Sequence, residues 1–283
     1  MREYATPAAF RAAVEAKLRE RSRQLGILAY ILRRQAGLER LAVRLMKVAP
    51  DRWALKGGFA LETRLGGHAR VSVDLDADHL RGAEAARADL QRAAVAEVGD
   101  HFGFAVTGTE KLRAGGLSLA VRYKLDSSIA GRPFEPLQVD VSVAPPVPWD
   151  AQAAWRPGLL AEFGLGPIEV WLVPLERQVA EKLHAYTRTY ESGGTTRARD
   201  LIDLLLIREH GHLDPVALRD AIQHLFSRRA THAVPDRLPP PAPELAVGYR
   251  REAEQVNVAS RLEDAHRLLA DWLNPVLARP PGS

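Results

Sequence analysis

The sequence predicts an α/β (α+β) fold in which a mixed sheet flanked by helices is followed by a helical C-terminal domain. Two patterns support this prediction. Between residues 51 and 173, short segments alternate apolar and polar residues, which is the spacing of half-buried strands. From residue 174 onward, apolar residues recur at intervals of three and four, which is the spacing of amphipathic helices. We therefore divide the chain into a basic helical arm over 1–50, an α/β core over 51–173 and a helical domain over 174–283.

The N-terminal arm is predicted to form two helices. Thr6 and Pro7 are typical of a helix start, because threonine caps the free N–H groups and proline suits the first helical position. The helical spacing is broken near Gly37, and a second helix is predicted over 38–48.

The core is predicted to contain six strands and two helices. The strands are expected over 53–56, 70–76, 104–109, 117–125, 137–143 and 168–172, and the helices over 59–65 and 83–99. In the segment 137–143 every second residue is Leu or Val, so the residues between them, including Asp140, face away from the core.

The C-terminal domain is predicted to contain helices over 174–190, 197–209, 214–229 and 244–277. The glycine- and threonine-rich segment 192–196 is expected to be a flexible connection. Five prolines between Pro235 and Pro243 predict an extended strap instead of a folded element.

The composition is that of a soluble globular protein, with 46% hydrophobic and 26% charged residues in 283. No apolar run is long enough to cross a bilayer, so we expect no membrane partner. The chain has no cysteine, which excludes disulfides, thiol nucleophiles and cysteine-bound zinc. We expect a cytoplasmic protein.

The positive charge is concentrated in the first 50 residues, which hold eleven Lys and Arg against four Glu and no Asp. Since the whole chain carries only +4, the remainder is net acidic. A basic arm suggests an RNA or DNA partner. The alternative is the codon usage of a GC-rich genome, because the chain has 33 Arg against 6 Lys.

The most specific pattern is a glycine turn followed by paired carboxylates. Asp74 and Asp76 lie at i and i+2 in a predicted strand, so they share a face and repel each other unless a cation lies between them. Mg²⁺ is the hard cation that suits both carboxylates and phosphates. Gly57 and Gly58 precede them at a helix start, where backbone N–H groups can bind a phosphate chain. Together these residues suggest a site for a nucleoside triphosphate and Mg²⁺.

Neighbouring residues extend this candidate site. Ser72 shares the predicted face with Asp74 and either binds a phosphate or caps the strand surface. Asp78 shares it too, but we expect it to be solvated where the strand ends. If the strand of Asp140 neighbours that of Asp74, three carboxylates converge; otherwise Asp140 is a solvent-facing aspartate on a half-exposed sheet.

Two further groups lie on predicted helices. Lys182 interrupts an apolar stripe, where a cation either extends to solvent or meets an anion. Arg199 and Asp203 are spaced i, i+4 and could form an intrahelical pair. Asp200 and Asp203 share one helix face, and we expect Asp203 to be structural.

These residues resemble a known family. Gly57-Gly58 followed by Ser72-x-Asp74-x-Asp76 resembles the opening motif of the DNA polymerase β-like nucleotidyltransferase superfamily. The wider pattern is similar to the AbiEii-type toxins of bacterial abortive-infection and type IV toxin–antitoxin systems. It consists of Lys56-Gly57-Gly58-x-Ala60-Leu61, Arg70-x-Ser72-x-Asp74-x-Asp76, Glu181-Lys182-Leu183-His184-Ala185 and Arg197-x-Arg199-Asp200-Leu201-x-Asp203-Leu204.

The resemblance implies a polymerase β-like sheet and a Mg²⁺-dependent nucleotidyltransferase. This enzyme would transfer a nucleoside monophosphate from a nucleoside triphosphate to an RNA hydroxyl, with a tRNA 3′ end as the expected acceptor. The protein would be a growth-inhibiting toxin with a cognate antitoxin.

The resemblance also implies roles for individual residues. Asp140 would complete the metal site and help to deprotonate the attacking hydroxyl, and Asp200 would orient Lys182 or the nucleotide. The implied catalytic residues are Asp74, Asp76, Asp140, Lys182 and Asp200, the first three also binding Mg²⁺. The implied nucleotide-binding residues are Lys56, Gly57, Gly58, Ser72, Lys182 and Arg199.

Two alternatives remain open. The first is a nucleotidyltransferase that modifies a small molecule such as an antibiotic and therefore needs no basic arm. The second is a non-catalytic protein that binds nucleotides or RNA.

Overall fold

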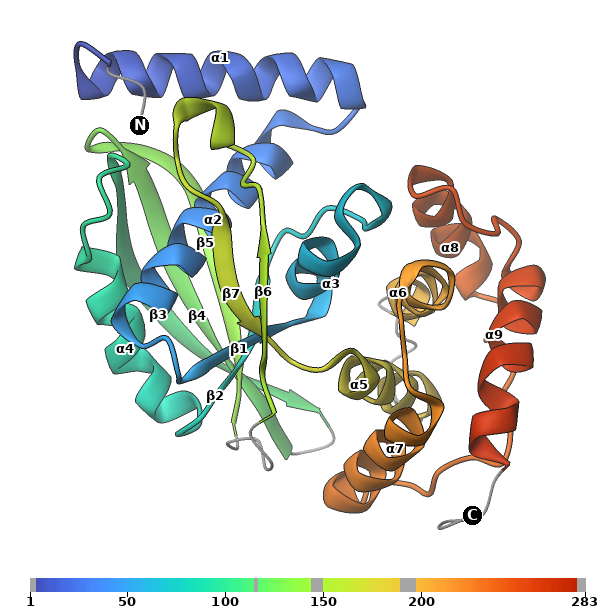
Figure 1. Cartoon of the computed structure of the whole chain (residues 1–283). Coiled ribbons are helices and arrows are strands. Elements are labelled where there is room, and N and C mark those ends of the chain that lie inside the picture. Colours follow the sequence, from blue (N-terminus) through green and yellow to red (C-terminus); the bar gives the residue numbers. More distant parts are fainter. Residues whose placement is uncertain (1–3, 115–116, 144–149, 189–196, 279–283) are drawn as a thin grey trace. The chain divides into compact units, whose positions relative to one another are not determined.

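The computed structural model describes residues 4–114, 117–143, 150–188 and 197–278 (Figure 1). The chain divides into two compact units. The sheet unit contains Met1–Thr63 and Val71–Val173, and the helical unit contains Arg64–Arg70 and Pro174–Ser283. The domain boundaries expected from the sequence stay a prediction.

The sheet unit is built on a seven-stranded sheet with the order β3-β4-β5-β2-β1-β7-β6. The pairs β1–β7 and β2–β5 are parallel, while the other neighbours are antiparallel, so the predicted mixed sheet is confirmed. The strands are β1 Trp53–Lys56, β2 Leu75–His79, β3 Phe102–Ala114, β4 Leu117–Ile129, β5 Arg132–Ser142, β6 Gln152–Arg156 and β7 Ile168–Leu172. The short strand β6 was missed by the sequence analysis.

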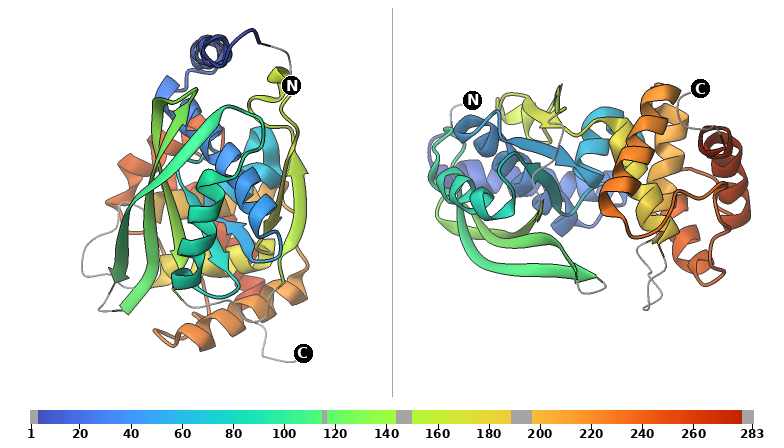
Figure 2. Two further views of the ribbon diagram at one scale, coloured as in Figure 1. Left: turned by 90° about the vertical axis from the view of Figure 1, so that its left-hand side faces the viewer. Right: turned by 90° about the horizontal axis from the view of Figure 1, so that it is seen from below.

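Helices α2 and α4 cover one face of this sheet (Figures 1 and 2). On that face Leu55, Leu75 and Val139 are fully buried in the core. Because side chains alternate along a strand, the residues next to these three in their own strands lie on the opposite face of the sheet. The helices of this region are α1 Pro7–Leu25, α2 Ala29–Val48, α3 Gly57–Leu65 and α4 Ala83–Val95.

The predicted break in the N-terminal helices is wrong. Thr6 does cap α1, accepting a hydrogen bond from the Ala9 N–H at 3.1 Å. However, α1 ends at Gly26, which has a positive φ of 67°, and α2 continues through Gly37. A Cβ at Gly37 would lie 3.1 Å from Leu137 Cδ2, so this glycine allows α2 to pack closely on β5.

The predicted aspartate strand over 70–76 is also wrong in its limits, because β2 begins only at Leu75. Its antiparallel partner β1 has four residues, and their pairing runs from Lys56 opposite Asp76 to Trp53 opposite His79. β1 ends at Lys56, because α3 begins at Gly57. Residues before Leu75 therefore have no β1 residue opposite them. The segment that carries Asp74 is therefore a loop.

The helical unit contains α5 Leu175–Thr187, α6 Arg197–His210, α7 Pro215–Arg229, α8 Leu245–Gln255 and α9 Leu262–Leu277. The single helix predicted over 244–277 is two helices, separated near Asn257, whose φ is 55°. The predicted flexible connection over 192–196 lies outside the described residues.

The proline-rich strap has no helix or strand. Its buried Leu238 donates its backbone N–H to Asn274 Oδ1 at 2.8 Å, and the Tyr186 hydroxyl donates to the Pro239 carbonyl at 2.8 Å. The strap is therefore fixed to both α5 and α9.

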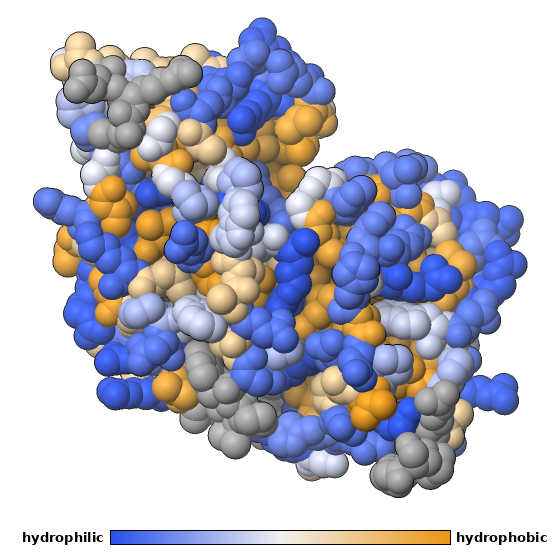
Figure 3. Space-filling view, viewed as in Figure 1, coloured by the Kyte–Doolittle hydropathy of each residue, from blue (hydrophilic) through white to orange (hydrophobic). Residues whose placement is uncertain are grey.

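The surface drawn in Figure 3 is mostly hydrophilic, with apolar residues exposed in scattered patches. Among the helices in the described ranges, none has the length and apolar character needed to span a membrane.

Candidate active site

The glycine turn predicted from the sequence lies where β1 meets α3. Gly57 has a positive φ of 64°, which side chains of L-amino acids rarely allow. A Cβ at this position would also collide with the Asp76 carboxylate. The backbone of Gly57 therefore lies directly against Asp76. The first N–H groups of a helix have no partner within it, so the start of α3 suits an anion.

Lys56, Asp76 and Asp140 form one row across three neighbouring strands. Lys56 of β1 is paired in register with Asp76 of β2, and Asp76 is paired in register with Asp140 of β5. Side chains in register share a face of the sheet, so all three lie on the face opposite the core. Of the two possibilities left open for Asp140, its strand does neighbour the aspartate strand, although that strand carries Asp76 and not Asp74.

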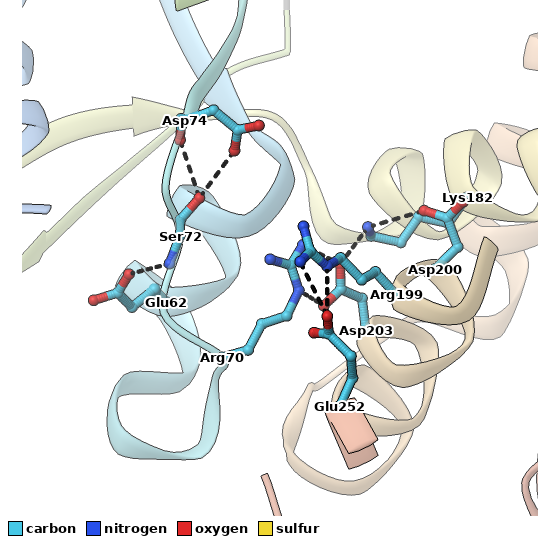
Figure 4. Close-up of polar contacts among 9 residues, drawn as sticks. All are labelled: Glu62, Arg70, Ser72, Asp74, Lys182, Arg199, Asp200, Asp203 and Glu252. Atoms are coloured by element: carbon cyan, nitrogen blue, oxygen red, sulfur yellow. Dashed lines mark hydrogen bonds and ion pairs between the residues drawn. The ribbon is translucent and has the colours of Figure 1, made fainter. Parts of the chain in front are cut away.

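Asp74 is positioned by its own loop and not by a strand. The Ser72 hydroxyl donates to the Asp74 carbonyl at 3.0 Å and lies 3.4 Å from Asp74 Oδ1 (Figure 4). Ser72 is buried, and its backbone N–H donates to Glu62 Oε2 at 3.4 Å. The expectation that Ser72 and Asp74 share a strand face is therefore wrong. In this structure Ser72 orders the loop that carries Asp74.

Glu62 supports this loop from α3. It is almost fully buried, and the Gln35 amide donates to its Oε1 atom. Burial raises the pKa of Glu62 to about 7, although the nearby Arg156 charge opposes the shift. The negative charge of Glu39 raises the pKa further.

Asp140 is held by Arg122, which the sequence analysis missed. Arg122 of β4 donates from Nε to Oδ1 at 2.8 Å and from Nη2 to Oδ2 at 2.7 Å. The hydrogen bond to Asp140 raises the pKa of Arg122, and the charge of Asp74 adds to this effect. A carboxylate has about four lone-pair positions, so this two-point contact orients Asp140 and leaves acceptor positions for a ligand.

Lys56 contacts groups on the same sheet face. Its ammonium group donates to the Ser142 hydroxyl at 2.9 Å and lies 3.1 Å from Asp78 Oδ1. The expectation that Asp78 is solvated is wrong, because β2 continues to His79 and Asp78 is buried. Only the strand pairing, which the sequence does not reveal, brings Asp78 beside Lys56.

In the helical unit, Lys182 of α5 meets two carboxylates of α6. Its Nζ atom lies 2.6 Å from Asp203 Oδ2 and 3.5 Å from Asp200 Oδ1 (Figure 4). Burial lowers the pKa of Lys182, but the charges of Asp203 and Asp200 outweigh this effect and raise it. The sequence left open whether Lys182 extends to solvent or meets an anion. In the structure it meets the carboxylates of Asp203 and Asp200.

Asp203 also binds Arg70, a contact that the sequence analysis missed. Arg70 donates from Nε to Oδ1 at 2.9 Å and from Nη2 to Oδ2 at 3.1 Å. Burial raises the pKa of Asp203, but Lys182 and Arg70 reverse the shift and lower it. The only sequence signal for Arg70 was its place in the Arg70-x-Ser72-x-Asp74-x-Asp76 motif.

The intrahelical pair considered for α6 is not found. Arg199 donates to Glu252 Oε1 of α8 at 3.0 Å and makes no intrahelical pair with Asp203, which binds Arg70 and Lys182. Asp203 is also nearer to Lys182 than Asp200 is. Asp200 Oδ2 accepts a hydrogen bond from Arg197 Nη1 at 2.6 Å. Burial raises the pKa of Asp200, although the charges of Lys182 and Arg197 oppose this shift.

The donor chemistry of the aspartates fits Mg²⁺, because the ion prefers carboxylate oxygens. Asp76 and Asp140 are adjacent, and Asp74 is two residues from Asp76. Within the described part of the chain, however, no three His, Cys, Asp or Glu side chains are grouped so that they could hold a metal ion. The set of three metal ligands stays a prediction.

The chain is similar to known nucleotidyltransferase toxins. The family described as nucleotidyl transferase AbiEii toxin, type IV TA system, matches residues 40–272. Among solved structures, MenT4, a nucleotidyltransferase toxin from Mycobacterium tuberculosis H37Rv, has a similar fold with a TM-score of 0.53 and 17% sequence identity. The match covers 97% of this chain and 99% of that chain. No curated protein matches the sequence.

Proposed function

Because the chain belongs to the AbiEii family of nucleotidyltransferase toxins of type IV toxin–antitoxin systems, we propose that it transfers a nucleoside monophosphate from a nucleoside triphosphate to an RNA hydroxyl. The observation that carries this proposal is the contact between the Gly57 turn and Asp76, which is itself in register with Asp140. The start of α3 and the carboxylates of Asp76 and Asp140 are thus adjacent within the sheet unit.

The triphosphate binds at the start of α3, where the N–H groups of Gly57 and Gly58 face its phosphates. Asp74, Asp76 and Asp140 would hold Mg²⁺, which would neutralise phosphate charge and polarise the α-phosphate. Lys56, Lys182 and Arg199 supply positive charge for the phosphates.

In the reaction, the acceptor hydroxyl oxygen forms a bond to the α-phosphorus while the bond to the α–β bridging oxygen breaks. Pyrophosphate leaves, and the hydroxyl proton passes to a carboxylate. We assign this general-base role to Asp140, because Arg122 fixes its orientation while acceptor positions remain on both oxygens. Asp200 contributes by orienting Lys182.

RNA is the proposed acceptor, with a tRNA 3′ end as the specific target. The modification of tRNA would inhibit growth, and a cognate antitoxin would oppose it. The basic N-terminal helices support an RNA partner, because Arg19 and Arg23 are exposed on α1. RNA and nucleoside triphosphates are both available in the cytoplasm, which is the proposed location.

One observation favours the alternative of a small-molecule acceptor. Several cations of the arm are already paired within the sheet unit, among them Arg21 with Glu162 at 2.9 Å and Arg33 with Glu135 at 2.6 Å. These pairs leave less positive charge for an RNA backbone than the sequence suggests.

The test is to incubate the purified protein with Mg²⁺, total RNA and each of the four α-labelled nucleoside triphosphates, and to separate the products on a denaturing gel. We expect label in RNA for wild type and none for Asp76→Asn. Label in a small molecule supports the alternative, and transfer by neither route contradicts the proposal.

A further inference from the structure

We propose that Arg70 is a positioning residue for nucleotidyl transfer: it fixes the Asp203 carboxylate, which in turn fixes the ammonium group of Lys182 for the triphosphate. This inference rests on the proposed function, because Lys182 contributes to the reaction only by contacting the nucleotide. Arg70 itself contacts neither nucleotide nor acceptor in this proposal.

The contacts of Asp203 support this role. Its side chain is only 1% exposed, and its two oxygens receive the planar guanidinium group of Arg70 at 2.9 and 3.1 Å. A two-point contact with arginine fixes the plane of a carboxylate, which a lysine cannot do. Oδ2 then accepts Lys182 Nζ at 2.6 Å through a remaining lone pair. The position of the Lys182 ammonium group therefore depends on the plane that Arg70 imposes.

The charges of the cluster support the same role. Two carboxylates, Asp200 and Asp203, are in contact with three cations, Lys182, Arg70 and Arg197. Burial raises the pKa of Asp203, but the charges of Lys182 and Arg70 outweigh this effect and lower it. Arg70 therefore helps to keep Asp203 ionised, which is the form that holds the Lys182 ammonium group.

A purely structural role for Arg70 makes a different prediction. Arg70 is the last residue of the segment Arg64–Arg70, which belongs to the helical unit, whereas the sheet unit resumes at Val71. If the ion pair only attaches this segment to α6, its loss lowers stability and leaves nucleotide affinity unchanged. The two roles can thus be separated by measuring binding.

The experiment is a double-mutant cycle on nucleotide affinity. Isothermal titration calorimetry with Mg²⁺ and the α,β-methylene analogues of the four nucleoside triphosphates measures binding to wild type, Arg70→Gln, Lys182→Met and the double variant. These analogues bind without releasing pyrophosphate. We expect Arg70→Gln to weaken binding roughly tenfold, equivalent to about 1.4 kcal/mol, and to have no further effect in the Lys182→Met background.

Two additional variants make the test specific. Arg70→Lys keeps the charge but loses the two-point contact, so its affinity should lie between those of wild type and Arg70→Gln, and it serves as the readout if Arg70→Gln does not fold. Arg267→Gln, which removes an exposed arginine paired with Asp264 in the helical unit, is the matched control and should bind like wild type.

The inference is overturned if Arg70→Gln and Arg70→Lys bind as tightly as wild type, whatever their melting temperatures. It is also overturned if Arg70→Gln weakens binding equally with and without Lys182, because Arg70 then acts independently. Failure of the proposed function looks different: wild type itself would bind none of the four analogues.

Discussion

Gly57 has two separate reasons to be glycine. Its positive φ disfavours any side chain, and a Cβ would collide with Asp76. Gly57→Ala should therefore reduce transfer by about 100-fold, since a displacement of roughly 1 Å in a reacting group has this effect. Gly66 is a matched control, because it also has a positive φ of 57° but a Cβ there would meet nothing within 4 Å. Gly66→Ala should lose a similar amount of stability, about 1–2 kcal/mol, and keep its activity. Equal activity in both variants would contradict the contact with Asp76.

The proposed chemistry depends most on the carboxylates of Asp74 and Asp76. Asp74→Asn and Asp76→Asn should each abolish transfer while the fold is retained. Mg²⁺ should raise the melting temperature of wild type more than that of either variant, because a ligand stabilises only the state that binds it. Full activity of either variant at saturating Mg²⁺ would refute the metal assignment.

Glu62 predicts a pH dependence of stability. Its pKa is about 7 in the folded protein, above its ordinary value of 4.5, because burial disfavours the charged form. The unfolded chain therefore loses this proton first, and the free energy of unfolding decreases as pH rises from 4.5 to 7. Glu62→Gln keeps an acceptor for Gln35 and removes the titration.

The measurement is thermal unfolding of wild type and Glu62→Gln at pH 5 and pH 8. The variant should gain stability relative to wild type at the higher pH. Glu263→Gln, at a side chain that is 75% exposed, should show no such change. An equal difference at both pH values would contradict the raised pKa.

At the scale of elements, α2 is attached to the start of β3 by a buried ion cluster. Arg40 and Arg44 both bind Asp100 at 2.6 Å, and Asp100 is fully buried. Burial raises the pKa of Asp100, but the two arginines outweigh it and lower the pKa. Arg44→Met should therefore lower the free energy of unfolding by about 3–5 kcal/mol, as is typical when one partner of a buried pair is removed.

Urea denaturation measures this loss. Lys124→Met is the control, because Lys124 and its partner Glu110 are about half exposed, and it should cost at most about 1 kcal/mol. A similar small loss for both variants would show that the Asp100 cluster does not hold α2 in place.

Elements with strong local patterns were predictable from sequence, and elements defined by distant partners were not. The ranges 53–56 and 168–172 match β1 and β7, because each is a short apolar segment with clear turn residues after it. The limits of β2 depend on how far β1 extends. From the sequence, Gly37 predicts a helix break. In the structure it lies within α2 and leaves space for the side chain of Leu137.

The candidate site also combines residues that have a local sequence pattern with residues that are defined only by distant partners. Gly57, Asp76 and Lys182 are candidates because they belong to the sequence motifs. The partners that orient them are separated widely in sequence, so Arg122 and Arg70 become evident only when strand register and helix packing are known.

At the scale of the whole molecule, the uneven charge predicts how RNA binds. Arg19→Glu and Arg23→Glu together should weaken RNA binding and reduce the slope of its salt dependence by about one unit for each lost phosphate contact. Binding of the nucleotide analogues should not change. Reversal of Arg261 and Arg267, which are 70% exposed in the helical unit, is the control. If the two double variants bind RNA equally, the arm is not the RNA site and the small-molecule acceptor becomes the better hypothesis.

The central claim is that an RNA hydroxyl receives the nucleoside monophosphate. The most direct test compares label transfer from α-labelled nucleoside triphosphate to intact tRNA and to tRNA whose 3′-terminal diol has been oxidised with periodate. The account predicts that wild type labels intact tRNA, that oxidation abolishes labelling, and that Asp76→Asn labels neither. Equal labelling of both tRNAs would contradict the 3′-end assignment, and no labelling of intact tRNA with any of the four nucleotides would contradict the claim itself.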